Sequence, residues 1–134
     1  MSMLDRTPAP LTLRLDAVPG SVPAARTALA DYARVAGALP DDVELAVAEA
    51  ASNSILHGYT SGKPGEIELC AEIGGGELVI TVADDGEGMR PHPQGGGLGL
   101  GLALIGQMTT SVTIRRPASG GTEVKMCFPI GEAA

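Results

Sequence analysis

The order in which two kinds of periodicity follow one another constrains the fold more than any other feature of this 134-residue chain. Apolar residues recur at helical spacing in residues 21–37 and again in 41–57, and apolar and polar residues alternate in segments on either side. Two helices in direct succession do not fit the strand–helix–strand order of a doubly wound fold. The pattern predicts an α+β two-layer sandwich, with three helices on one face of a mixed, mostly antiparallel sheet.

The length suits one domain, residues 1–134, in which residues 1–10 form a loose leader. The strands are expected at 11–16, 66–73, 77–84, 111–116 and 122–130, and the third helix at 100–109. No segment approaches the ~20 apolar residues of a membrane helix, and the N-terminus lacks the apolar core of a signal peptide. We therefore expect a cytoplasmic protein that does not contact membranes, with Cys70 and Cys127 as reduced thiols.

Charge and aromatic content exclude several classes of partner. The formal net charge is −7, and the chain has one Phe, two Tyr and no Trp. Nucleic acid backbones and anionic lipids attract basic surfaces, and single-stranded bases stack on aromatic side chains. Direct nucleic acid binding is thus not expected. Binding of a single nucleotide stays open, because backbone N–H groups hold phosphates without basic residues.

Three polar side chains interrupt the otherwise apolar second helix. Glu49, Asn53 and His57 recur at steps of four, so they lie on one stripe of the helix, and the stripe is bordered by Leu and Ala. A solvated face normally carries Lys and Glu, yet no Lys or Arg occurs between residues 41 and 57. The stripe therefore fits the lining of a cavity. An exposed face with hydrogen bonds between residues four apart is the alternative.

The first glycine motif comes directly after a predicted strand. Asp84, Gly86 and Gly88 form an Asp-x-Gly-x-Gly turn, in which the glycines let the backbone pass close to a ligand. Asp84 is then placed to accept a hydrogen bond from an amine, such as that of a purine. The alternative is a polar hairpin turn, because Asp-Gly pairs are common there.

The second glycine motif, GGGLGLGLALIG, stands where the third helix begins. Gly97, Gly99 and Gly101 alternate with Leu98 and Leu100. Glycine costs roughly 1 kcal/mol at a helical position, so three in a first turn need a reason. Unobstructed N–H groups at a helix N-terminus bind phosphate. Neither a P-loop nor a Rossmann fingerprint matches the spacing. A flexible hinge is the alternative.

In chain order, these motifs and the Gly121-Thr122 pair resemble the GHKL ATP-binding superfamily, which has the Bergerat fold. Within it, the chain is most similar to the anti-sigma-factor serine/threonine kinases of bacterial partner-switching systems. The phrase AVAEAASNSILHGY and the short segment 89–96 between the glycine motifs carry this likeness, which spans residues 11–130.

The resemblance implies a role for each matching residue. Glu49 looks like the catalytic carboxylate, Asn53 like the Mg²⁺-binding asparagine, and Asp84 like the acceptor of the adenine amine. The remaining nucleotide contacts are expected at Gly86, Gly88, Gly97, Leu98, Gly99, Leu100, Gly101 and Thr122. Arg90 is the only basic candidate between the glycine motifs for the γ-phosphate.

The resemblance also implies an activity and partners. It implies an anti-sigma factor and serine/threonine kinase that uses Mg-ATP to phosphorylate a Ser or Thr of a STAS-type anti-sigma-factor antagonist, and so regulates release of a sigma factor. Such proteins pair as homodimers. A partner surface is expected on the first helix around Arg26, Tyr32 and Arg34, and an ordinary solvated face is the alternative there. The alternatives are an ATP-dependent sequestering module without kinase activity and a detached histidine-kinase catalytic domain.

Overall fold

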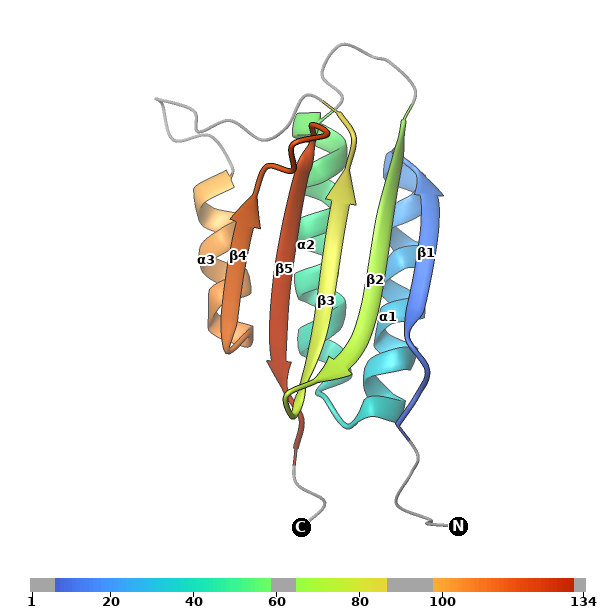
Figure 1. Ribbon diagram of the computed structural model, residues 1–134, viewed down its shortest axis with the longest axis vertical. Coiled ribbons are helices and arrows are strands. Elements are labelled where there is room, and N and C mark those ends of the chain that lie inside the picture. The colour runs from blue at the N-terminus through green and yellow to red at the C-terminus, as the bar shows by residue number, and fades with distance from the viewer. Residues whose placement is uncertain (1–6, 59–64, 87–97, 132–134) are drawn as a thin grey trace.

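The computed structural model describes residues 7–58, 65–86 and 98–131, and the side chains in these ranges except at 57–58 and 98–102. Figure 1 shows a sheet of long strands in front of a layer of helices. The elements in chain order are β1 (Leu11–Asp16), the single turn η1 (Pro19–Ser21), α1 (Val22–Ala36), α2 (Pro40–Gly58), β2 (Glu66–Gly74), β3 (Glu77–Asp84), α3 (Leu98–Met108), β4 (Ser111–Arg115) and β5 (Thr122–Pro129).

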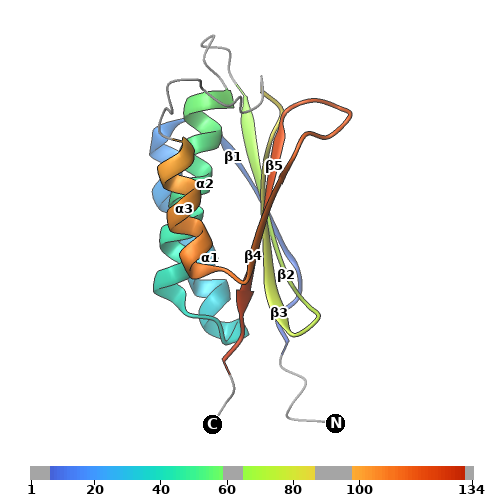
Figure 2. The same cartoon turned by 90° about the vertical axis from the view of Figure 1, so that its left-hand side faces the viewer.

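The sheet has five strands in the order β1-β2-β3-β5-β4, and α1, α2 and α3 all cover the same face, as Figure 2 shows. The predicted α+β two-layer sandwich is confirmed. Each described strand pair is antiparallel, so the expectation of a mixed sheet is wrong. The reason is the connections: β2 and β3 form a hairpin, and α3 leads the chain back so that β4 and β5 also pair as a hairpin.

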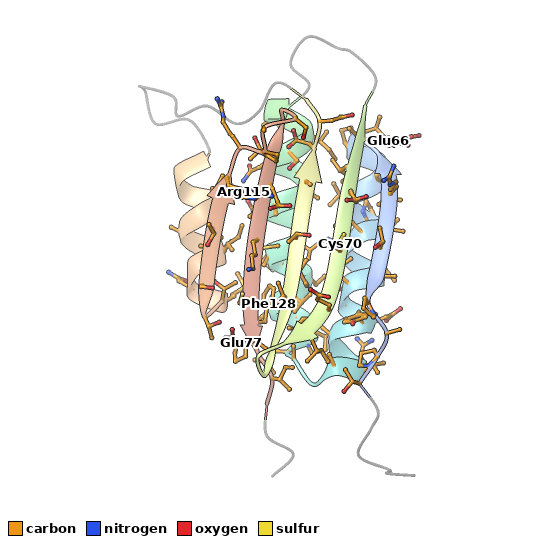
Figure 3. All side chains as sticks on the ribbon, in the orientation of Figure 1. Glu66, Cys70, Glu77, Arg115 and Phe128 are labelled. Atoms are coloured by element: carbon orange, nitrogen blue, oxygen red, sulfur yellow. The ribbon has the colours of Figure 1, made fainter. Side chains whose placement is uncertain are left out.

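The core lies between the two layers and is mostly aliphatic. Every second residue of β3 from Leu78 to Val82 is fully buried, and Val43 and Val47 of α2 are fully buried as well. Phe128, labelled in Figure 3, is 1% exposed. Period-two alternation in the strands and helical spacing in α2 therefore direct apolar side chains into one shared layer.

None of the described helices lies over the opposite face of the sheet, and this face carries charged side chains (Figure 3). Arg14 Nε lies 3.0 Å from Glu68 Oε2, and Arg115 Nε lies 2.7 Å from Glu123 Oε1. Exposed ion pairs of this kind contribute about 0–1 kcal/mol each to the free energy of unfolding. They therefore make this face of the sheet hydrophilic but add little stability.

Gly37 caps the C-terminus of helix α1, and its φ of 95° is the left-handed conformation that glycine adopts without strain. Tyr32 on this helix is buried, and its hydroxyl donates a hydrogen bond to the Pro8 carbonyl oxygen at 3.4 Å. The expectation that Tyr32 belongs to a partner surface is therefore wrong, because its ring packs into the core. Arg26 and Arg34 are exposed.

The termini that bear on a possible site lie at one end of the molecule. Figure 1 shows the C-terminal end of α2, the end of β3, the start of α3 and the start of β5 at the upper end. Helix α2 packs against both α3 and β3. In the part of the chain that the structure describes, no helix is long and apolar enough to cross a membrane.

Candidate functional site

Two polar side chains from neighbouring strands face the helices at this end. The register of β3 and β5 sets Asp84 opposite Thr122. Both follow the alternation of the buried residues in their strands, so both point into the layer between sheet and helices. Asp84 is 7% exposed and Thr122 is 1% exposed. A carboxyl group and a hydroxyl group are thus buried side by side at the end of the sheet.

Helix α2 brings two more polar side chains into the same layer. Asn53 is 8% exposed and Ser54 is fully buried. Three buried atoms have no hydrogen-bond partner among the described residues, namely Asn53 Nδ2, Ser54 Oγ and Asp84 Oδ2. Buried polar atoms in folded proteins are nearly always paired, so three unpaired ones at one end of the fold indicate a site that a polar ligand completes.

Ser54 was not predicted from the sequence. The signal that was available is helical spacing, because Ser54 comes seven residues, or about two turns, after the buried Val47 and so lies on the same face of α2. A lone hydroxyl on that apolar face marks a polar group turned toward the sheet.

Burial raises the pKa of the Asp84 carboxyl above its ordinary value, and the nearby Asp85 carboxylate raises it further. Three groups act in the opposite direction: the backbone N–H groups of Gly86 and Thr122 and the Ser54 hydroxyl. The Gly86 N–H donates to Asp84 Oδ1 at 3.1 Å. The Ser54 hydroxyl lies near the carboxyl without making a hydrogen bond of full geometry, so Oδ2 stays available to another donor.

Gly121 lies against the backbone of Asp84. Its φ is 79°, and a Cβ atom at this position would lie 1.9 Å from the Asp84 carbonyl oxygen and 3.0 Å from the Asp85 Cα. No other residue type fits there without moving the end of β3. The turn before β5 therefore sets the position of Asp84 by direct backbone contact, which gives the Gly121-Thr122 pair a structural reason.

Glu49 is half-buried and lies one turn before Asn53 on α2. Helix α3 begins at Leu98 and packs against α2, so Gly99 and Gly101 fall in its first turn, at the same end of the fold as Asp84. Free N–H groups of a first helical turn bind anions.

Some of the predicted site residues lie outside the part of the chain that the structure describes. Gly88, Gly97 and Arg90 lie outside the described residues, as do the side chains of His57 and of residues 98–102. The structure brings Asn53, Asp84 and Thr122 to one end of the core, with Glu49 on the same helix as Asn53 and Gly86 bonded to Asp84. The binding and catalytic roles of all these residues stay predictions.

The polar side chains of this site suit a metal ion that is bound mainly by the phosphates of a ligand. Within residues 7–58, 65–86 and 98–131, no three His, Cys, Asp or Glu side chains come close enough to form a metal site of their own. Mg²⁺ is commonly held by one or two protein oxygens together with phosphate oxygens and water. Asn53 offers its amide oxygen as such a single protein ligand, whereas its unpaired Nδ2 is a hydrogen-bond donor that suits a phosphate oxygen.

Comparison with solved structures identifies a similar fold. The chain matches the RsbU and RsbW domains of a Mycobacterium tuberculosis protein with a TM-score of 0.72 and 25% identity. The match covers 95% of this chain and 34% of that one.

Curated relatives share part of the sequence. An anti-sigma F factor of Clostridium botulinum (strain Eklund 17B) is 43% identical over 53 residues, which are 40% of this chain and 37% of the relative. The anti-sigma F factor of Clostridium acetobutylicum is 33% identical over 97 residues, or 64% of this chain and 67% of the relative. The serine-protein kinase RsbW of Bacillus licheniformis is 33% identical over 92 residues, covering 66% of this chain and 58% of the kinase.

A family model covers most of the chain. The model for the histidine kinase-like ATPase domain matches residues 15–128, a range that contains Asn53, Asp84 and Thr122. The two-layer fold, the buried polar site between its layers and this match agree, and the chain belongs to the histidine kinase-like ATPase domain family.

Proposed function

We propose that this protein is an anti-sigma factor and serine/threonine kinase, which binds Mg-ATP and phosphorylates a Ser or Thr of an anti-sigma-factor antagonist. The family match supports use of ATP, and relatives named anti-sigma F factor and serine-protein kinase support the finer activity. The observation that carries the proposal is the buried Asp84 carboxylate, which has one oxygen bonded to Gly86 and the other unpaired.

Asp84 selects the base in this proposal. A buried carboxylate oxygen without a donor is costly, and an exocyclic amine supplies the missing N–H. Thr122, opposite Asp84 and 1% exposed, borders the same space. Adenine fits this end of the layer, with its amine on Asp84 and its remaining edges near Thr122.

The phosphates extend toward the start of α3. The N–H groups of its first turn, at Gly99 and Gly101, point out of the helix end and are available to phosphate oxygens. Asn53 supplies one oxygen ligand to Mg²⁺, which neutralises phosphate charge when bound. Gly88, Gly97, Leu98 and Leu100 belong to the same proposed contact set.

Glu49 is the proposed general base. It lies one turn before Asn53 on α2. Because Asn53 is the proposed metal ligand, this proposal sets Glu49 beside the phosphates. Its carboxylate accepts the proton of the substrate hydroxyl as the hydroxyl oxygen bonds to the γ-phosphorus, and the bond from that phosphorus to the β–γ bridging oxygen breaks, releasing ADP. A positioned base of this kind contributes roughly 10²- to 10⁴-fold to the rate.

The proposed partners are a STAS-type antagonist, a sigma factor and a second copy of this chain. Arg26 is exposed at the start of α1 and borders a mainly apolar hollow of about 450 Å³, together with Val22, Pro23 and Leu56. Leu56 is 66% exposed, which leaves a large apolar side chain in solvent close to the end of α2 that carries Asn53. This surface suits a protein partner whose binding depends on whether a nucleotide occupies the neighbouring site.

The test is phosphate transfer from radiolabelled ATP to candidate antagonist proteins. We expect label on the antagonist that survives acid, because phosphoserine and phosphothreonine are acid-stable. Acid-labile label would identify a histidine kinase instead. Nucleotide binding and sigma-factor capture without any transfer would identify a sequestering module.

A further inference from the structure

The buried hydroxyl of Ser54 has no part in the reaction described above, although it lies beside the proposed adenine pocket. Ser54 is 0% exposed, and its Oγ has no hydrogen-bond partner among the described residues. An alanine would fill the same space without burying an unpaired hydroxyl. Ala50 and Ala51, about one turn earlier on the helix, are buried in this way. The hydroxyl is therefore a cost to the fold unless a ligand-bound state uses it.

The two oxygens of the Asp84 carboxylate have different surroundings. Oδ1 accepts from the Gly86 N–H at 3.1 Å, whereas Oδ2 is buried and unpaired. An ionised carboxylate oxygen has room for two donors. The Ser54 hydroxyl and an exocyclic amine are therefore able to bind Oδ2 together.

We propose that Ser54 is a positioning residue: when nucleotide binds, its hydroxyl donates to Asp84 Oδ2, holds the carboxylate between α2 and the Gly86 N–H, and so makes the site selective for a 6-aminopurine. This inference rests on the proposed function, because it assumes that Asp84 receives the adenine amine. Held from both sides, the carboxylate keeps its second lone pair of Oδ2 aimed at the base. Without Ser54, the carboxylate is free to rotate, and the amine loses a fixed acceptor.

The first experiment compares two nucleotides by calorimetry. ADP has the exocyclic amine, and purine riboside 5′-diphosphate lacks only that amine. The wild-type protein is expected to prefer ADP by roughly tenfold or more. Ser54→Ala should reduce this preference about three- to tenfold while leaving the affinity for the amine-free nucleotide unchanged. The matched control is Ser52→Ala, which makes the same change at an exposed position of the same helix and should keep the wild-type preference.

Two further readouts separate positioning from packing. In an Asp84→Asn background, Ser54→Ala should change the ADP affinity less than about twofold, because the carboxylate through which Ser54 acts is gone. The nucleotide-free Ser54→Ala protein should unfold within roughly 3 °C of the wild-type temperature, because removing a buried hydroxyl without a full hydrogen bond is offset by losing its favourable effect on the Asp84 carboxylate.

The outcomes are distinct. A preference for ADP that survives Ser54→Ala overturns the inference, and so does an equal loss of affinity for both nucleotides, which is the result of a packing defect. A wild-type protein that binds neither nucleotide contradicts the proposed function itself. A wild-type protein that binds ADP while the Ser54→Ala preference is unaltered leaves the proposed function intact and removes only the role of Ser54.

Discussion

Gly121→Ala tests whether the turn before β5 positions Asp84. The new methyl group would lie 1.9 Å from the Asp84 carbonyl oxygen, well inside contact distance, and φ at this residue is 79°. The left-handed backbone costs an alanine about 1–2 kcal/mol. Forcing the end of β3 to move adds about 1–3 kcal/mol, the usual cost of overpacking. The expected total is about 2–5 kcal/mol of unfolding free energy.

Gly76→Ala is the matched control. Gly76 has nearly the same φ, 77°, but a Cβ atom there meets nothing within 4 Å. Its substitution carries the backbone cost and the same change in the unfolded chain, without the clash. We therefore expect a loss of about 1–2 kcal/mol for this variant. The difference between the two variants isolates the contact between Gly121 and Asp84.

The assay is urea unfolding of the three proteins, followed by calorimetric titration of the folded proteins with ADP. Gly121→Ala should lose more stability than Gly76→Ala, and it alone should bind ADP more weakly, since the displaced backbone carries Asp84. Equal destabilisation of the two variants would refute the contact. Wild-type ADP affinity in Gly121→Ala would refute the link between this turn and the nucleotide pocket.

Two other predictions concern Asp84 and the partner surface. Because burial raises the pKa of Asp84 and the adenine amine needs the ionised carboxylate, ADP affinity should fall as the pH drops through that raised pKa, as calorimetry across pH would show. In the nucleotide-free protein the native state binds this proton more tightly than the unfolded state does, so Asp84 contributes less stability as the pH rises from its unfolded to its folded pKa. Asp84→Asn should remove both dependences, and a pH profile unchanged in this variant would disprove the assignment. Leu56→Asp on the hollow beside Arg26 should weaken capture of the antagonist or sigma factor at least about tenfold in a pull-down titration, while ADP affinity stays normal. Unaltered capture would remove this surface from the proposal.

The helices and strands were predictable because their apolar residues repeat at regular spacings. The alternating runs in β2 and β3 and the glycines at 74–76 between them predict a hairpin, and the structure has strands at Glu66–Gly74 and Glu77–Asp84. All-antiparallel pairing was not predictable in full, because periodicity gives each strand a face but no neighbour. The path of the chain through α3 decides that β5 lies beside β3.

The candidate site was predictable only in part. Asp84 and Asn53 stand out in sequence because each is polar at an apolar position, and both are buried in the structure. Ser54 received no prediction from the sequence. Tyr32 was misjudged because an amphipathic side chain fits a surface or a core, and only tertiary packing decides between the two. The close approach of Gly121 to Asp84 joins residues far apart in the chain, and no local pattern reveals it.

The central claim is that Glu49 moves a proton during phosphate transfer while Asp84 and Asn53 hold the nucleotide. The most direct measurement compares Glu49→Gln with Glu44→Gln, a second half-buried glutamate earlier on the same helix, in single-turnover transfer from ATP to the antagonist. Glu49→Gln should lower the rate at least ~100-fold and keep the ATP affinity within about threefold, whereas Glu44→Gln should transfer normally. Transfer by Glu49→Gln at the wild-type rate would contradict this account.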